Sequence, residues 1–108
     1  MTYTQIAEMI AGFGLPYAFN EFPDGTDQEP PFICFLYDYD DFHADNVNYV
    51  GKVQLIIELY TAEKDFALEA SLEAYLTQQG FAYDKTATRI DSEKMWQIAY
   101  TMEVFINA

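Results

Sequence analysis

The sequence predicts an α+β fold in which an antiparallel sheet carries two helices on one face. Three observations lead to this prediction: two segments with apolar residues at helical spacing, an apolar run bounded by turn residues, and two segments of alternating apolar and polar residues. The expected element order is α-β-β-α-β-β, and stacking both helices on one face would bury every apolar stripe. The 108 residues suit a single domain spanning 1–108.

The first helix is predicted from its cap residues and its apolar spacing. Thr2 and Gln5 have the spacing of a capping box, and apolar residues follow at helical intervals at Ile6, Met9, Ile10 and Phe13. Gly14 stands where a left-handed C-cap is expected, and Pro16 comes just beyond it. Residues 15–30 carry turn-forming Pro and Gly and predict an extended surface connection.

Two strands joined as a hairpin are predicted next. Residues 31–37 form a short apolar run between turn signals, which is typical of a buried strand. From Val47 to Leu59, apolar residues alternate with polar ones, which predicts a long strand with one apolar face. Gly51 lies within this segment, where a bulge or bend would form.

A second helix and two more strands complete the chain. Thr61 is the expected N-cap, and Gly80 is the expected end of the helix. Residues 81–90 then predict a strand. The segment 95–106 gives the clearest strand pattern, because six apolar residues share one face: Trp96, Ile98, Tyr100, Met102, Val104 and Ile106.

The charge balance is strongly acidic and unevenly placed. Eighteen Asp and Glu oppose five Lys and Arg, a formal net charge of −13, and residues 1–51 hold no Lys or Arg. Affinity for nucleic acid depends largely on basic side chains that neutralise phosphates, and anionic membranes impose the same requirement. We therefore expect neither specific nucleic-acid binding nor membrane binding. The N-terminus lacks the basic region of a secretory signal, which predicts a cytosolic location.

An acidic segment lies between the first two predicted strands. Asp38, Asp40, Asp41 and Asp45, together with His43, place five metal-ligand types within eight residues. The EF-hand spacing fails, because His43 stands at the sixth position in place of Gly. We expect these aspartates to face solvent or a pore and to bind no metal; a metal-dependent enzyme built on them is the least favoured alternative.

No other catalytic constellation is evident. Cys34 lies inside an apolar run, where burial raises the pKa of a thiol and makes it a small hydrophobe. The sequence contains no P-loop, dinucleotide fingerprint, nucleophile elbow or zinc-protease motif. A protein without catalytic residues or a cofactor is the prediction.

Three phenylalanines are candidates for a subunit interface. Phe19 and Phe22 are apolar residues on the otherwise acidic 15–30 connection, and Phe42 is an aromatic residue within the acidic segment. Apolar residues on such excursions are suited to docking on a neighbouring subunit. Packing over the chain's own sheet is the alternative.

Four stretches resemble a known family: 15–25 (LPYAFNEFPDG), 30–37 (PPFICFLY), 57–69 (IELYTAEKDFALE) and 91–96 (DSEKMW). Together they look like a small tail-component protein of Firmicutes tailed phages and prophages, and the resemblance covers nearly the whole chain. It implies a tail-terminator or tail-completion role, by analogy of fold and gene order. The motifs mark no active site.

The resemblance also implies the partners and the location. The protein would form a ring of identical subunits, with a hexamer among the sizes allowed, in contact with the major tail protein and the head-tail connector protein. It would be found in the virion tail, and in the host bacterial cytoplasm during assembly. An acidic pore would let DNA pass without binding it. A head-tail joining role, another minor tail role and an acidic DNA-mimic inhibitor remain alternatives.

Overall fold

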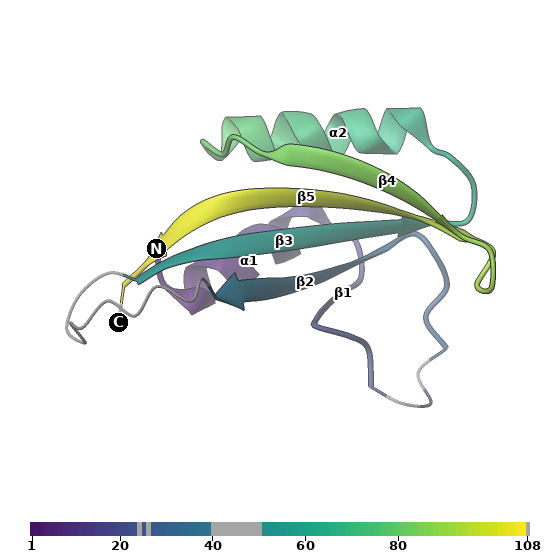
Figure 1. The fold of residues 1–108 in the computed structure, drawn as a ribbon, viewed down its shortest axis with the longest axis horizontal. Coiled ribbons are helices and arrows are strands. Elements are labelled where there is room, and N and C mark those ends of the chain that lie inside the picture. The colour runs from purple at the N-terminus through teal and green to yellow at the C-terminus, as the bar shows by residue number, and fades with distance from the viewer. Residues whose placement is uncertain (24, 26, 40–50, 108) are drawn as a thin grey trace.

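The structure, a computed structural model, describes residues 1–23, 25, 27–39 and 51–107, which form two helices and one five-stranded sheet (Figure 1). The strand order in the sheet is β1-β2-β3-β5-β4. The expected α+β content is therefore confirmed, with one strand more than expected. In chain order the elements are α1 (Tyr3–Phe13), β1 (Tyr17–Phe19), β2 (Phe32–Tyr39), β3 (Gly51–Thr61), α2 (Phe66–Gln78), β4 (Asp84–Ile90) and β5 (Met95–Ile106).

The additional strand, β1, lies within 15–30, where the sequence predicts an extended surface connection and no sheet strand. It pairs with β2 in parallel, with Phe19 opposite Phe35, whereas the other three strand pairs are antiparallel. Backbone hydrogen bonds extend the pairing at both ends, from Ile33 to the Pro16 carbonyl and from Asn20 to the Phe35 carbonyl. Three residues are too few to show a period of two, so only the pairing with β2 defines this strand.

Helix α1 begins and ends where its cap residues predict. The Thr2 side chain accepts a hydrogen bond from the Gln5 backbone amide, and the Gln5 side chain accepts one from the Thr2 amide. Gly14 ends the helix with a left-handed φ of 100°. The capping-box prediction is confirmed.

The N-cap of α2 lies four residues later than predicted. Asp65 is the N-cap, and its carboxylate accepts a hydrogen bond from the Leu68 amide. Thr61 is instead the buried last residue of β3, because it continues that strand's alternation of buried positions. The apolar periodicity of β3 therefore prevails over the capping potential of a threonine.

The C-terminal end of α2 explains why β4 starts at Asp84 and not at residue 81. The Phe81 amide donates to the Leu76 carbonyl, and the Gly80 amide donates to the Thr77 carbonyl. These two bonds form a Schellman motif around Gly80, whose φ is 92°. Phe81 packs against the core as part of this helix end.

Both helices contribute to one core on one face of the sheet. Alternate residues of β2, β3 and β5 form a single buried cluster with Ile6 and Ile10 of α1 and with Leu72 and Leu76 of α2. The Tyr75 hydroxyl of α2 donates to the Met9 carbonyl of α1 at 2.7 Å, which joins the helices directly.

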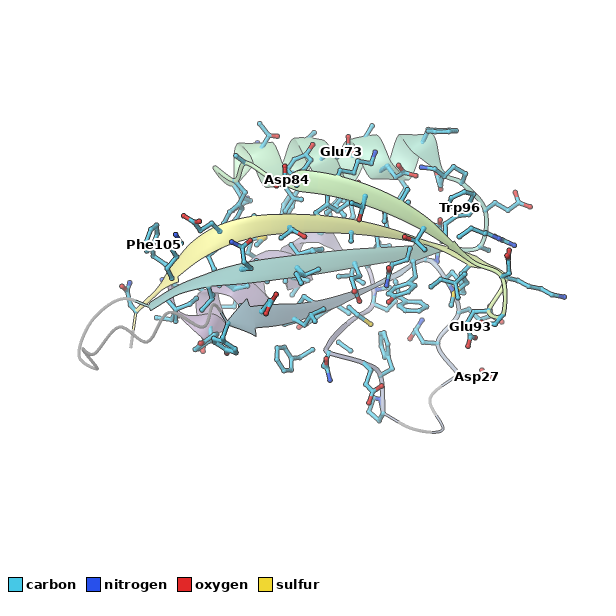
Figure 2. All side chains as sticks on the ribbon, viewed as in Figure 1. Asp27, Glu73, Asp84, Glu93, Trp96 and Phe105 are labelled. Carbon is cyan, nitrogen blue, oxygen red and sulfur yellow. The ribbon has the colours of Figure 1, made fainter. Side chains whose placement is uncertain are left out.

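The opposite surface of the sheet, called here the open face, has no helix of the described chain over it. Leu36, Ile56 and Thr101 lie in register there and are partly buried, and Phe105 is exposed. Figure 2 shows Phe105 near the end of β5. The two chain ends lie together in Figure 1, where the Asn107 amide donates to the Met1 carbonyl. Neither helix in the described parts of the chain is long and apolar enough to cross a membrane.

Candidate functional site

An open, mostly apolar groove lies between α1 and the β1–β2 edge of the sheet. Phe35, Tyr37 and Tyr39 point to the same face because they alternate along β2, and the parallel pairing of β1 places Phe19 beside them. Tyr3 and Ala7, one helical turn apart on α1, line the other side. We call this set the aromatic groove; its volume is about 340 Å³.

The rings of the aromatic groove contact one another closely. The Tyr3 and Tyr37 centroids lie 4.9 Å apart, edge to face, and the Phe19 centroid lies 5.8 Å from that of Tyr37. The Tyr3 and Tyr39 hydroxyls are hydrogen-bonded to each other at 3.1 Å across the groove. The walls are therefore held in place by mutual contacts between α1 and β2.

The hydroxyls of Tyr3 and Tyr37 are neutral at physiological pH. The hydrogen bond between the Tyr3 and Tyr39 hydroxyls, followed by burial, raises the pKa of Tyr3 to about 12. Burial raises the pKa of Tyr37 to about 12, and its hydroxyl has no hydrogen-bond partner among the described residues. The lining thus consists of neutral aromatic rings, one alanine and hydroxyl groups.

Exposed large apolar side chains concentrate at the β1–β2 edge of the sheet. Seven large apolar side chains are exposed in the described structure, and four of them lie along the β1–β2 edge: Tyr3, Tyr17, Phe19 and Tyr39. Phe19 and Tyr39 are 58% and 59% exposed. Clustered exposed aromatic residues are characteristic of surfaces that contact another molecule.

A second site, made of polar side chains, lies between α2 and the β4–β5 edge. Glu69 is 1% exposed, and Lys64 and Lys85 both bind its carboxylate, at 2.6 Å and 2.9 Å. Lys85 also binds Glu73 at 2.6 Å, and Glu73 accepts a 2.7 Å hydrogen bond from the Tyr100 hydroxyl. Figure 2 shows Glu73 on α2 beside β4. We call these five residues the lysine–carboxylate cluster.

The charged side chains of this cluster form ion pairs with one another. Burial favours the neutral form of Glu69, but hydrogen bonds from Lys64 and Lys85 outweigh it and hold the pKa of that carboxyl below its usual range. The hydrogen bonds that Lys85 donates to Glu73 and Glu69 raise its own pKa. Burial and the bond to Glu73 raise the pKa of Tyr100 far above normal. The cluster joins α2 to β4 and β5, and it presents no activated nucleophile or base.

The predicted acidic surface lies mostly outside the described residues. Asp38 is exposed in β2, in register with Gln54 on the open face. Asp40, Asp41 and Asp45 belong to the residues that the structure does not describe. Within 1–23, 25, 27–39 and 51–107, no three His, Cys, Asp or Glu side chains group as metal ligands.

The predicted interface phenylalanines do not form one patch. Phe19 belongs to the aromatic groove, on the helix-covered face of the sheet. Phe22 is partly buried and packs edge-on against Phe32 of the opposite face, with ring centroids 5.2 Å apart. Phe42 lies outside the described residues.

Cys34 is buried on the open-face side of β2, as its apolar neighbours in sequence predict. Burial, reinforced by Glu58 and Glu21, raises the pKa of its thiol to about 11. A thiol protonated at physiological pH is a poor nucleophile.

The few basic side chains are mostly neutralised within the chain. Lys52 pairs with Glu103 at 3.3 Å and Arg89 with Asp91 at 3.4 Å, in addition to Lys64 and Lys85 of the lysine–carboxylate cluster. In the described structure, Lys94 is the base that takes part in no ion pair. The surface therefore offers excess negative charge and little free positive charge.

Two groups of residues were not anticipated from the sequence. Tyr37 and Tyr39 of the aromatic groove are one group, and the signal for them is that Phe35, Tyr37 and Tyr39 repeat with a period of two. Glu69 stands three residues before Leu72 on the buried side of α2, and an acid inside an apolar stripe is a signal for a buried ion pair.

The chain matches no protein-family model, no curated protein and no solved structure in the three comparisons made with known proteins.

Proposed function

We propose that this protein is a non-enzymatic structural protein of a tailed phage or prophage, a tail terminator that caps the tail tube and joins it to the head. The sequence resemblance suggests the particle. The observation that carries the proposal is the concentration of exposed aromatic side chains at one edge of an acidic molecule. An exposed edge of this kind is suited to contact with another protein subunit.

The two edge strands of the sheet support assembly into a ring. One edge is the three-residue strand β1, and the other is β4, whose residues are mostly exposed. Since these edges differ, a contact between one edge and the other is heterologous, and heterologous contacts close into rings when the rotation permits. The major tail protein and the head-tail connector would bind the two ends of such a ring.

The excess negative charge suits a channel for DNA. Four of the five basic residues are paired with acids of the same chain, so few are free to hold phosphate. Figure 2 shows two acids, Asp27 and Glu93, at the end that holds the β4–β5 turn. An acidic surface repels the DNA backbone and lets it slide past.

Electron microscopy of particles made without this protein tests the proposal. We expect a phage whose copy of this gene is deleted to make tails of irregular or excessive length, and supply of the intact gene from a plasmid to restore uniform tails. Normal tubes separated from heads would indicate the head-tail joining role instead. Normal, infectious particles would exclude both roles.

A second test uses purified components. Added to major tail protein that is polymerising into tubes, the protein should bind one tube end and stop growth there. Tubes that grow at an unchanged rate, with no density added at either end, would contradict the terminator assignment.

The acidic surface also favours a second candidate, an inhibitor that mimics DNA and occupies a DNA-binding protein of the host. Tight binding to a basic DNA-binding protein, competed by duplex DNA, together with no binding to tail tubes, would favour this candidate over the terminator.

A further inference from the structure

We propose that the aromatic groove is a binding site for the cationic head of a lysine or arginine side chain on a partner protein. This inference goes beyond the assembly role and does not depend on it. It rests on the ring arrangement, the hydroxyl groups and the charge of the surroundings.

The rings offer the surface that an organic cation requires. An ammonium or guanidinium group is attracted to aromatic faces within about 6 Å of the ring centroid. The centroids of Tyr3, Phe19 and Tyr39 each lie between 4.9 and 6.3 Å from that of Tyr37, so the four rings form one continuous aromatic surface for a cation to contact. Phe19 and Tyr39 are more than half exposed, which leaves their faces accessible.

The hydroxyl groups offer acceptors for N–H donors. Tyr3 and Tyr39 share one hydrogen bond, in which one hydroxyl is the donor and the other the acceptor. Each hydroxyl oxygen keeps a lone pair that an ammonium or guanidinium N–H could use. A purely hydrocarbon occupant would leave these acceptors without a partner.

The negative charge of the chain as a whole favours a cation over an anion. No charged side chain of the described residues lines the groove, and the chain carries a net charge of −13. Four of its five bases are engaged in ion pairs, and Lys64 itself lies 4.8 Å from the centroid of the Phe66 ring. A basic segment of a partner is therefore attracted to this surface, whereas an acidic segment is repelled.

The open shape of the groove points to a side chain presented by a protein. The groove follows the edge of the sheet and is bounded by exposed residues, so it covers the end of a long side chain but encloses little more. The aliphatic part of that side chain lies outside the groove, so the partner protein that carries the side chain has to hold it in position. Lysine and arginine have both the long stem and the cationic head.

Matched peptides test whether the positive charge is what the groove recognises. The probes are capped tripeptides Gly-Lys-Gly and Gly-Arg-Gly, with norleucine and citrulline as neutral counterparts, titrated into the full chain at physiological salt. We expect NMR shifts at Tyr3, Phe19 and Tyr39, and binding of the cationic peptides that is tighter by about 2-fold to 30-fold. Equal binding of charged and neutral peptides, or no binding of any, would overturn the proposal.

A matched pair of variants separates the groove from general attraction to an acidic protein. Phe19→Leu keeps an apolar side chain but removes a ring from the groove. Phe105→Leu removes a ring from the open face, and the exposure of the two phenylalanines is nearly equal, 58% for Phe19 and 57% for Phe105. We expect only Phe19→Leu to weaken the cationic peptides, with thermal unfolding confirming that both variants are folded. Equal weakening by both would overturn the proposal. Tyr39→Leu, at another exposed wall residue, should reproduce the loss.

Discussion

At the scale of single residues, Glu69 is a buried acid that depends on two ion pairs. It is the buried acid of α2, and its carboxylate is held by two lysines whose own side chains are 25% and 36% exposed. A buried charge is costly unless it is paired, so the lysines are required for Glu69 to remain ionised in the core. The same pairs tie Lys64, which precedes α2, and Lys85 of β4 to this helix.

Glu69→Gln should destabilise the protein. Glutamine keeps the volume but loses the charge, and it leaves two lysines without their shared partner. We expect a loss of about 1–3 kcal/mol in the free energy of unfolding, less than for fully buried pairs because the lysines stay partly solvated. Urea denaturation measures this loss. Glu73→Gln, at a more exposed acid of the same cluster, should cost less; an equal cost would contradict the special role of Glu69.

The contribution of Glu69 should depend on pH in a defined direction. Its folded pKa is lowered by Lys64 and Lys85, so below an unfolded value of about 4.3 the unfolded chain takes up a proton that the folded chain does not. Its stabilisation is therefore present above that value and lost as pH falls through the folded pKa. The stability gap between the native protein and Glu69→Gln should be constant from pH 6 to 8 and shrink toward pH 3, as followed by urea unfolding at each pH. A gap that widens in acid would contradict this.

At the scale of elements, cap residues and the competition between strand and helix patterns set where each helix and strand begins and ends. The capping box sets the start of α1, whereas α2 has its N-cap only at Asp65 because β3 keeps Thr61 as its last buried residue. The Schellman motif at Gly80 removes Phe81 from the following strand. In each case the local hydrogen bonds explain the boundary.

Two substitutions distinguish the real cap of α2 from the expected one. Asp65→Ala removes the acceptor for the Leu68 amide and should cost about 1 kcal/mol. Thr61→Val removes a buried hydroxyl that has no hydrogen-bond partner in the described structure, and it should leave stability unchanged or raise it slightly. Thermal unfolding of both variants measures the effect. A larger loss for Thr61→Val than for Asp65→Ala would indicate that Thr61 is the cap.

At the scale of the whole molecule, association has to overcome the net charge of −13. Like charges repel most strongly at low ionic strength, where screening is weakest. Apolar surface is available for contact at the aromatic groove and on the open face. We therefore expect an isolated chain that is a monomer or weak oligomer and that closes into a ring on the tube end.

Raising the salt concentration should promote self-association, measured by light scattering. Salt screens the acidic repulsion and leaves apolar attraction intact. Association that weakens with salt would show that pairing of opposite charges holds the subunits together.

Phe22→Asp should reduce association, because it adds a negative charge at a proposed subunit contact. The fold should persist, because Phe22 is only partly buried against Phe32. Phe66→Asp adds the same charge at a side chain that is 73% exposed on α2, away from that contact, and serves as the control. Circular dichroism checks folding of both variants. An unfolded Phe22→Asp protein would show that this residue belongs to the core.

The sequence by itself determined the features that local chemistry specifies. The cap residues of α1 marked both of its ends, and the six apolar residues at every second position of 95–106 marked β5 over its full length. The pairing of β2 with β3 followed from their adjacency and their apolar patterns. These signals succeed because capping and alternation involve residues within a few positions of one another.

Only the tertiary structure decided which distant residues meet. The parallel pairing of β1 brings Phe19 beside Phe35, and the packing of α1 brings Tyr3 onto Tyr37, so the aromatic groove exists only in the folded chain. Likewise, Glu69 meets Lys85 across sixteen positions because α2 packs beside β4. Such contacts depend on sheet order and helix placement, and no pattern of nearby residues encodes them.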